Sequence, residues 1–508
     1  MQVGKIKASV QAEKQNIAFV AKVCLQYNLT NHEKMKIILS TLFLIGFVCP
    51  VSAQELTEPQ KAAVDGIMAE YDQAGHPGAA VAIVRGGKTA YAQGYGLANI
   101  ENNIPFTPET VSDIGSVAKQ ITAFAIIRLA QEGKLALDDD IRKYLPEVPD
   151  FGRPIRIVDL IHHTSGLREI YGAWAIAGGR SGDGILQEDA LYLAQRSKEL
   201  NFPPNTRHMY CNTGYMLLAD IISRVSGMPF ETWMRTHIFQ PLGMDHTFIM
   251  DERGEVFPGA ATSYETSPKN GFRQIFDNST VQGAGGIYTT IPDLVKWLNN
   301  YRDPKIGGQK AVEQMLERGV LNNGDTLAYA FGLTVGQYRG LRLIRHTGSS
   351  AGYRAVFTWL PDQDLGIVVK SNFAGFAGSD LSNRMIDLLL GPVLGPAPAA
   401  TGEEDEDGLF SFVDTSPEYL NAYTGKYYCP ELETVYEIRM ENGGLVGGNW
   451  RHRNLPLKFL GEDYWEDTEG PLGEIRFERD EKGRVTGMRV TGGGVVNLWM
   501  ERGRGGEG

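Results

Sequence analysis

Hydrophobic and polar positions alternate in some parts of the chain and recur with helical spacing in others. Residues 79–84 and 89–93 flank Arg85-Gly-Gly-Lys88, which predicts a β-hairpin with a two-glycine turn. Helical patterns dominate from about residue 110 to 320, including the apolar run Gly214–Val225. Strand patterns then return in Leu341–Arg345, Tyr353–Leu360 and Leu365–Lys370. Strands at both ends predict an α+β domain, in which one antiparallel sheet is closed by the first and last strands and lies beside a helical subdomain.

A second strand-rich region follows a segment rich in proline, glycine and acidic residues. Residues 391–414 cannot bury enough apolar surface to order themselves, so we expect a linker. Residues 415–502 show short strand patterns separated by turns, at Thr434–Met440, Ile475–Glu478, Val485–Val490 and Val495–Met500. This spacing predicts a small all-β barrel or meander. Because few contacts are expected across a disordered tether, we expect a protein that ends near Pro396 to fold without the barrel.

Residues 1–53 differ from both of these regions. Met35-Lys36, the apolar run Ile37–Val48 and the small residues before Gln54 have the pattern of a secretory signal peptide. We therefore expect Met35 to be the start, residues 1–34 to be a non-native extension, and the mature protein to be secreted or periplasmic with no membrane span after cleavage. A short membrane anchor is the alternative, although the apolar run is short for a bilayer.

Charge and cysteine content narrow the classes of partner and cofactor. The 508 residues carry a net charge of −12 without a Lys/Arg-rich run, which argues against nucleic acid and anionic membranes as partners. After signal cleavage Cys211 and Cys429 remain, in different expected domains, so no disulfide framework is predicted. No group of residues has metal-ligand spacing, and we expect no metal and no other cofactor. The adjacent His162 and His163 are interpreted as structural.

Ser116 and Lys119 are the first candidate catalytic pair. Residues three apart lie on one helix face, so the hydroxyl and the amine can meet. A serine is a weak nucleophile until a base takes its proton, and a lysine becomes such a base when burial lowers its pKa. The almost wholly apolar segment Gln120–Ala130 predicts a buried helix, which Gly133 would end. The alternative is an ordinary helix start, because this spacing also occurs by chance.

Two further segments add candidate polar groups. Tyr210 can pass protons, and the Asn212 amide can orient a substrate carbonyl. The alternatives are a packed ring and the N-cap of the following helix. His346-Thr347-Gly348-Ser349 ends a strand, where it can align a substrate backbone and offer an amide N–H to an oxyanion, or can be a simple turn.

Together these motifs resemble the class C branch of the serine β-lactamase and penicillin-binding-protein superfamily. The order of S-x-x-K, Y-x-N and a [KH]-T-G triplet is that of the family, as are Gly283–Tyr288 and Gly133–Asp138. The resemblance covers roughly residues 55 to 390 and implies a β-lactamase/transpeptidase-like fold. Residues 415–502, with Tyr423–Tyr427 near their start, resemble the lipocalin-like domain that some members append.

The resemblance also implies roles for these residues. Ser116 would be the acylated nucleophile, Lys119 and Tyr210 would share the acid and base work, and Asn212 would bind substrate. The backbone N–H groups of Ser116 and Ser349 would form the oxyanion hole, and the substrate would lie along His346, Thr347, Gly348 and Ser349.

His346 is a departure from the pattern, because β-lactamases usually have lysine there. A histidine that gains its charge only near pH 6.5 should hold a substrate carboxylate poorly unless Arg354 compensates. The implied function is a secreted serine hydrolase that acts through an acyl-enzyme on small D-amino-acid-containing peptides or related amides. A carboxylesterase, a weak β-lactamase and a catalytically silent binding protein are the alternatives, and the oligomeric state stays open.

Gly348–Gly352 also fits G-x-S-x-G, the nucleophile elbow of α/β-hydrolases. That alternative requires a strand–turn–helix at this point and a histidine later in the chain. A strand pattern follows Gly352 instead, and the only later histidine is His452, beyond the linker. The α/β-hydrolase interpretation is therefore disfavoured.

Overall fold

The computed structural model describes residues 55–180, 182–396 and 416–503. The expected signal peptide, the expected start at Met35 and most of the expected linker lie outside these ranges. Among the described residues, no helix is both long and apolar enough to cross a membrane.

The central element is a six-stranded antiparallel sheet with the strand order β10-β11-β12-β13-β1-β2. Its strands are β1 (Ala79–Arg85), β2 (Lys88–Tyr95), β10 (Thr334–Tyr338), β11 (Leu341–Ser350), β12 (Tyr353–Leu360) and β13 (Leu365–Ser371). Strand β1 pairs with β13, with Val81 opposite Val369, so early and late parts of the chain join in one sheet. This confirms the predicted α+β fold and its closure; β10 was not predicted.

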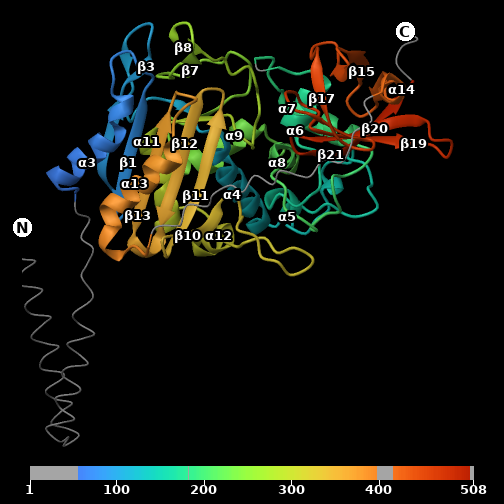
Figure 1. Cartoon of the computed structure of the whole chain (residues 1–508). Coiled ribbons are helices and arrows are strands. Elements are labelled where there is room, and N and C mark those ends of the chain that lie inside the picture. Colours follow the sequence, from blue (N-terminus) through green and yellow to red (C-terminus); the bar gives the residue numbers. More distant parts are fainter. Residues whose placement is uncertain (1–54, 181, 397–415, 504–508) are drawn as a thin grey trace, which may run out of the picture. The chain divides into compact units, whose positions relative to one another are not determined.

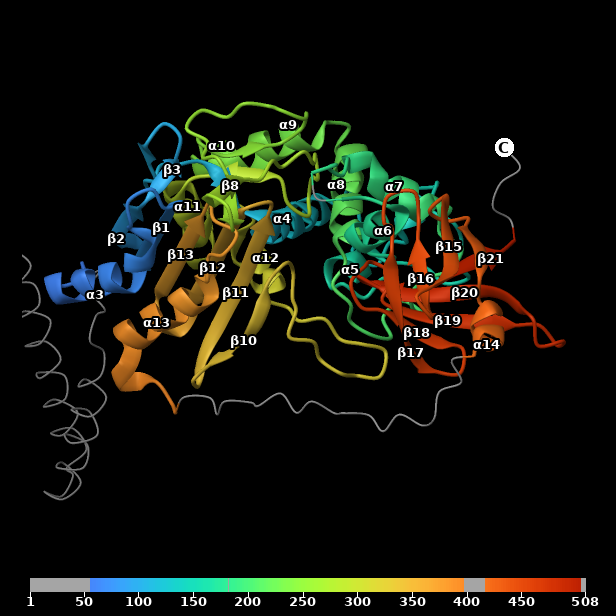
Figure 2. The ribbon, with the colours of Figure 1, turned by 45° about the horizontal axis from the view of Figure 1, so that its top comes forward.

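Both faces of this sheet are covered by helices (Figures 1 and 2). Side chains alternate across a strand, so Ala79, Val81 and Ile83 pack with helices α3 (Glu58–Met68) and α13 (Gly378–Leu390). The alternate residues Ala80, Ala82 and Val84 face the core that contains α4 (Ala118–Gln131) and α11 (Ile291–Arg302). Burial on both faces explains why β1 reads as a continuous apolar run.

Helices and short strands between β2 and β10 form the rest of the first domain. The remaining helices are α5 (Ile157–Ile161), α6 (Ile170–Ala177), α7 (Gln187–Arg196), α8 (Asn212–Ser226), α9 (Phe230–Met234), α10 (Gln240–Leu242) and α12 (Gly308–Met315). The short strands are β3 (Leu97–Asn99), β4 (Ile104–Pro105), β5 (Ser112–Asp113), β6 (Phe248–Ile249), β7 (Tyr264–Ser267), β8 (Gly271–Gln274) and β9 (Ile287–Thr289). Helix α4 ends as predicted, because Gly133 has φ +70° just beyond the C-cap Glu132.

The C-terminal region is a closed antiparallel barrel of eight strands, preceded by α14 (Pro417–Asn421). The strands are β14 (Gly425–Cys429), β15 (Thr434–Glu441), β16 (Gly444–Gly448), β17 (Leu455–Gly461), β18 (Tyr464–Asp467), β19 (Glu474–Arg479), β20 (Val485–Gly492) and β21 (Val495–Arg502). Buried aromatic rings, including Tyr427, Tyr436 and Phe477, help to fill its core. The predicted barrel is confirmed, and four of its strands, β14, β16, β17 and β18, were not predicted.

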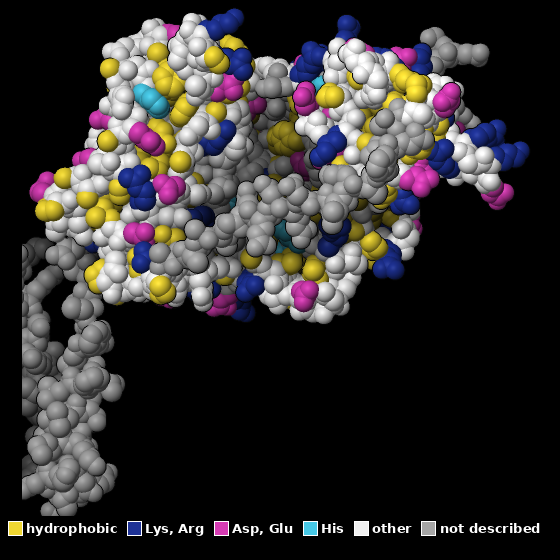
Figure 3. Space-filling view, in the orientation of Figure 1, with side chains coloured by type: hydrophobic (Ala, Val, Ile, Leu, Met, Phe, Trp, Pro, Cys, Tyr) yellow, Lys and Arg dark blue, Asp and Glu magenta, His cyan; other side chains and the backbone are white. Residues whose placement is uncertain are grey.

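The barrel contacts the helical subdomain directly, and the expectation of few contacts was wrong. Arg168 forms a buried ion pair with Glu431, and the Tyr436 hydroxyl donates to the Ile176 carbonyl at 2.9 Å. The described residues 55–180, 182–396 and 416–503 accordingly belong to one compact unit. The composition of a linker says nothing about such long-range pairings. Charged side chains of both signs are interspersed on the face shown in Figure 3.

Candidate active site

Ser116 lies in a short 3₁₀ turn, η2 (Gly115–Val117), immediately before α4. The end of β11 packs against this turn backbone to backbone. A Cβ on Gly348 would lie 1.8 Å from the Ile114 carbonyl oxygen, and one on Gly115 would lie 2.5 Å from the Ser349 nitrogen. Only glycine permits this approach at either position. It brings together the backbone N–H groups of Ser116 and Ser349, the two residues predicted to form an oxyanion hole.

Lys119 is fully buried and bonded to three oxygens. Its Nζ lies 2.9 Å from Ser116 Oγ, 2.7 Å from Asn212 Oδ1 and 2.8 Å from the Ala284 carbonyl oxygen. Burial lowers the pKa of Lys119 to about 7, although the nearby Glu169 charge opposes the shift. The amide and carbonyl oxygens can only accept hydrogen bonds. A neutral amine therefore keeps its two N–H groups on them and directs its lone pair at the Ser116 hydroxyl.

Tyr210 lies on the other side of the lysine. Its ring centroid is 4.9 Å from Lys119 Nζ, and 37% of the residue is exposed. Partial loss of water around the phenol raises its pKa above the usual value, while a hydrogen bond with Ser116 opposes the rise. The phenol thus keeps its proton at neutral pH and suits a proton relay better than a base. His163 Nδ1 accepts the Cys211 N–H at 3.0 Å and so supports the Tyr210 segment, which agrees with its predicted structural role.

Asn212 is the first residue of α8, and the N-cap is Cys211, so the alternative N-cap role for Asn212 is wrong. Its side chain lies between Lys119 and Glu169. Glu169 Oε1 accepts from Asn212 Nδ2 at 2.8 Å, and Oε2 accepts from the Asn212 backbone N–H. Because a carboxylate accepts the amide N–H, the amide oxygen must face the lysine. Sequence reasoning missed Glu169, which lies 43 residues before Asn212.

His346 is buried and uses both ring nitrogens within the protein. Nδ1 lies 2.6 Å from the Thr347 carbonyl, which only accepts, so Nδ1 carries the proton and Nε2 accepts from the Tyr329 hydroxyl at 2.9 Å. Burial lowers the pKa of His346 to about 4, and the Lys119 charge adds to the shift. The expectation that it gains charge near pH 6.5 is therefore corrected. Its ring lies 6.4 Å from that of Tyr210.

Arg354 does not replace the missing positive charge. Its Nη1 donates to the carbonyls of Ala351 and Tyr353 at 2.9 and 2.7 Å, within the turn between β11 and β12. The same turn contains Gly348–Gly352, which connects two strands and not a strand and a helix. The α/β-hydrolase elbow is therefore excluded here.

A cavity of about 200 Å³ opens over Ser116. Its described lining is Gly115, Ser116, Tyr171, Asn212, Met250, Asp277, Ser279, Val281, Ala284, Gly285, Gly286, Tyr288, Ser349, Ser350 and Ala351. None of these is lysine or arginine. The predicted residues Ser116, Asn212 and Ser349 thus share one cavity. The other predicted residues are not among its lining residues: Lys119, Tyr210, His346, Thr347, Gly348 and Arg354.

Asp277 is the only charged residue in the described lining of this cavity, and sequence reasoning missed both Asp277 and the nearby Asp113. Asp277 accepts from Ser350 Oγ at 2.7 Å and from the Ser279 backbone N–H at 3.0 Å. Asp113 is buried behind the wall and accepts the Gly115 N–H at 2.8 Å. Burial and the Asp277 charge raise the pKa of Asp113 to about 7. The pocket therefore presents negative potential to a substrate.

The Beta-lactamase family model matches residues 61–391, more than half of the chain. The chain belongs to the Beta-lactamase family. Among curated proteins, it is 30% identical over 509 residues to the D-aminopeptidase of Brucella ovis, covering 84% of this chain and 95% of that one. It is 28% identical over 382 residues to the D-aminopeptidase of Gluconobacter oxydans, covering 73% and 71%.

Solved structures of other proteins share this fold. The octameric penicillin-binding protein homologue from Pyrococcus abyssi aligns with a TM-score of 0.59 at 25% identity, covering 87% of this chain and 98% of that one. The D-amino acid amidase from Ochrobactrum anthropi SV3 aligns with a TM-score of 0.56 at 23% identity, covering 66% and 99%. The chain is thus a Beta-lactamase-family hydrolase related to D-aminopeptidases.

Proposed function

We propose that this protein is a serine hydrolase that forms an acyl-enzyme on Ser116 and cleaves amide bonds next to a free amino group, in D-amino-acid amides or short D-peptides. The observation that carries the proposal is the contact between Lys119 Nζ and Ser116 Oγ at 2.9 Å inside a buried site. The D configuration rests on the names of the curated relatives, which are D-aminopeptidases.

The chemistry follows from the hydrogen-bond donors and acceptors. Neutral Lys119 takes the Ser116 proton as Oγ bonds to the substrate carbonyl carbon. The resulting oxyanion accepts from the backbone N–H groups of Ser116 and Ser349, and each such donor typically lowers the barrier by about 3–4 kcal/mol. The C–N bond then breaks, and the leaving nitrogen receives the proton from Lys119 directly or through Tyr210. Water hydrolyses the ester by the reverse proton path, which restores Ser116.

The electrostatics of the cavity favour a cationic substrate. Asp277 lines the cavity, and its described lining contains no basic residue. His346 stays neutral, so nothing at the third motif attracts a carboxylate. An ammonium group beside the scissile carbonyl would donate a charge-assisted hydrogen bond to Asp277, whereas a carboxylate-bearing β-lactam would be repelled.

Steady-state kinetics on paired substrates test this proposal. D-alanine amide and its N-acetyl derivative differ in one charge, and L-alanine amide tests configuration. Losing one charged hydrogen bond of roughly 1.5–3 kcal/mol predicts about a 10- to 100-fold preference for the free amine. Asp277→Asn should erase most of it, and Asp362→Asn, at an exposed position after β12, is the matched control.

Ser116→Ala should abolish both turnover and fluorophosphonate labelling. Equal rates on the two amides would contradict the amino-group preference. Faster turnover of a p-nitrophenyl ester or of nitrocefin would favour the esterase or β-lactamase alternative, and absence of labelling in the wild type would favour the silent binding protein.

We also propose that the protein is secreted or periplasmic. The support is the charged, apolar and small-residue pattern of Met35–Gln54. N-terminal sequencing of protein from the native host should give a start at or near Gln54, and a start before Met35 would contradict the proposal.

A further inference from the structure

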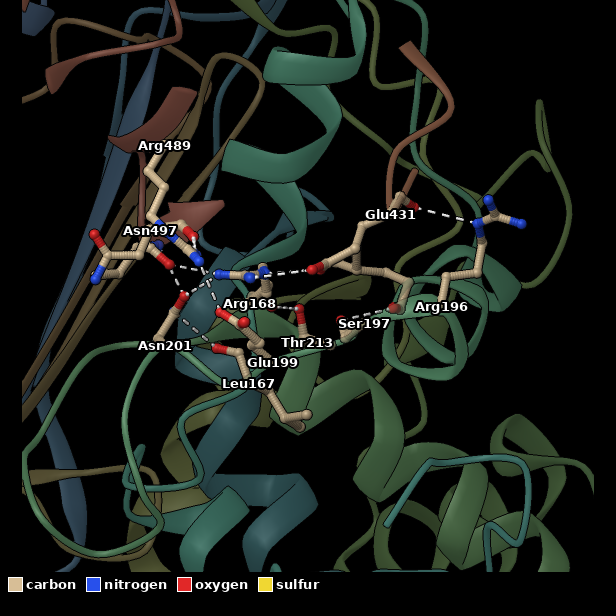
Figure 4. A network of polar contacts seen from close by, with 12 residues as sticks. Leu167, Arg168, Arg196, Ser197, Glu199, Asn201, Thr213, Glu431, Arg489 and Asn497 are labelled. Atoms are coloured by element: carbon tan, nitrogen blue, oxygen red, sulfur yellow. Dashed lines mark hydrogen bonds and ion pairs between the residues drawn. The ribbon is translucent and has the colours of Figure 1, made fainter. Parts of the chain in front are cut away.

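A buried arginine joins the barrel to the helical subdomain (Figure 4). Arg168 donates from Nε and Nη2 to the two carboxylate oxygens of Glu431 at 2.9 and 3.2 Å. Its Nη1 donates to Asn201 Oδ1 at 3.0 Å and to the Val496 carbonyl at 2.6 Å. The side chains of Arg168 and Glu431 are only 1% and 4% exposed. A bidentate pair excluded from water fixes the orientation of both partners.

The turn between β20 and β21, Gly493-Gly494, lies against Glu169, the residue after Arg168. The Glu169 N–H donates to the Gly494 carbonyl at 3.2 Å, and Asn201 Nδ2 donates to the same oxygen at 2.8 Å. A Cβ on Gly494 would lie 2.7 Å from Glu169 Cβ and 3.1 Å from its Cγ. The backbones of Gly172 and Gly493 also touch, since a Cβ on Gly172 would be 2.0 Å from the Gly493 oxygen. The barrel turn therefore forms one wall of the space that Glu169 occupies.

Glu169 continues the path to the lysine. Its carboxylate accepts from the side chain and the backbone of Asn212, and Asn212 Oδ1 accepts from Lys119 Nζ at 2.7 Å. The chain of contacts thus runs from Gly494 through Glu169 and Asn212 to Lys119, and each step is a direct hydrogen bond.

We propose that the β20–β21 turn of the barrel positions Glu169 and, through Asn212, holds Lys119 in register with Ser116. The barrel is then a component of the catalytic centre and not an appended module. This inference rests on the proposed acyl-enzyme function, because Lys119 needs a positioning residue only if it serves Ser116.

The test compares two glycines of the barrel that have the same backbone strain. Gly494 has φ +80° and Gly483 has φ +75°, but a Cβ on Gly483 meets nothing within 4 Å. Gly494→Ala and Gly483→Ala therefore both place alanine in a left-handed conformation, and only the first pushes on Glu169. Glu169→Gln removes the carboxylate itself and serves as the direct comparison.

The readout is the pH dependence of the rate at which a fluorophosphonate labels Ser116 in the full chain. The rate should rise with pH as Lys119 loses its proton, around the pKa of about 7. The Glu169 charge raises that pKa, so displacing or removing it should move the midpoint to lower pH. The charged or titratable groups that interact with Lys119 are Glu169, Cys211, Asp113, His163, His346, Tyr210 and Tyr215. None of these residues is itself substituted in Gly494→Ala or in Gly483→Ala.

We expect Gly494→Ala to label roughly 10- to 100-fold more slowly, with the midpoint shifted in the same direction as in Glu169→Gln. The double variant should shift no further than Glu169→Gln alone. Partial misfolding would lower the labelled fraction at saturation but would not move the midpoint. Matching rates and midpoints in Gly494→Ala and Gly483→Ala would overturn the positioning proposal alone. A wild type that is not labelled on Ser116 would overturn the proposed function, and this inference with it.

Discussion

Breaking the buried ion pair between Arg168 and Glu431 should destabilise the protein far more than breaking the more exposed pair between Arg196 and Glu433. Glu431→Gln keeps the size of the side chain but leaves the Arg168 charge, 1% exposed, without a counter-charge. The hydrogen bonds to Asn201 and Val496 remain, but neither partner is ionised. Removing one partner of a buried pair costs about 3–5 kcal/mol of unfolding free energy.

Glu433, two residues after Glu431, provides a matched control. Glu433 pairs with Arg196 at 3.0 Å, with 56% of its side chain exposed. Water screens that pair, so Glu433→Gln should cost about 1 kcal/mol or less. The two variants make the same chemical change on the same segment of the barrel and differ mainly in burial.

The assay is urea unfolding of the full chain, followed by tryptophan fluorescence and by circular dichroism. The shift in midpoint multiplied by the slope gives the change in unfolding free energy. Arg168→Met combined with Glu431→Leu is the third arm, because replacing both charges should restore much of the stability. Equal small losses in both single variants would refute the reasoning, since the interface would then contribute no more than a surface contact.

Two further predictions concern the catalytic residues. Lys119→Ala and Tyr210→Phe should each slow acylation severely. The double variant should be little worse than the poorer single variant, because the effects of residues that act as a unit are non-additive. Full additivity of the two losses in stopped-flow acylation would count against a shared proton path. In an Asp113→Asn background, which removes a carboxyl with a pKa of about 7 beside the cavity, the kcat/KM ratio of nitrocefin to a p-nitrophenyl ester should stay flat between about pH 5.5 and 7.5, because His346, with a pKa of about 4, is neutral throughout. A rise of this ratio on acidification through 6.5 would show that His346 gains charge there, whereas His346→Lys should raise the ratio at every pH.

The pattern of apolar residues and turns along the chain predicted those strands whose buried residues are contiguous in the sequence. The hairpin of residues 79–93 and the strand Tyr353–Leu360 were predicted because their apolar runs and turns are contiguous in the chain. Strand β10 was missed because Thr334–Tyr338 contains a glycine and a glutamine and lies at the sheet edge. In the barrel, β16 was missed because three of its five residues are glycine.

In the candidate site, too, contacts between residues close in the sequence were predicted and contacts between distant residues were not. Spacing of three residues predicted the contact between Ser116 and Lys119, because a helix start alone determines it. Glu169 and Asp277 could not be predicted, since their partners Asn212 and Ser350 lie 43 and 73 residues away. The neutral state of His346 depends on its burial and on the nearby Lys119 charge, and the motif shows neither that burial nor that proximity.

The three oxygens around Lys119 have a consequence for the whole reaction cycle. Two of them belong to an amide and a carbonyl, so their bonds to the lysine keep the same polarity whether the nitrogen is charged or neutral. Only the third bond reverses, when the serine oxygen changes from donor to acceptor and back. In the proposed mechanism Lys119 can therefore take a proton from Ser116 or from water, and give it to the leaving nitrogen or back to Ser116, while its bonds to Asn212 and Ala284 stay in place.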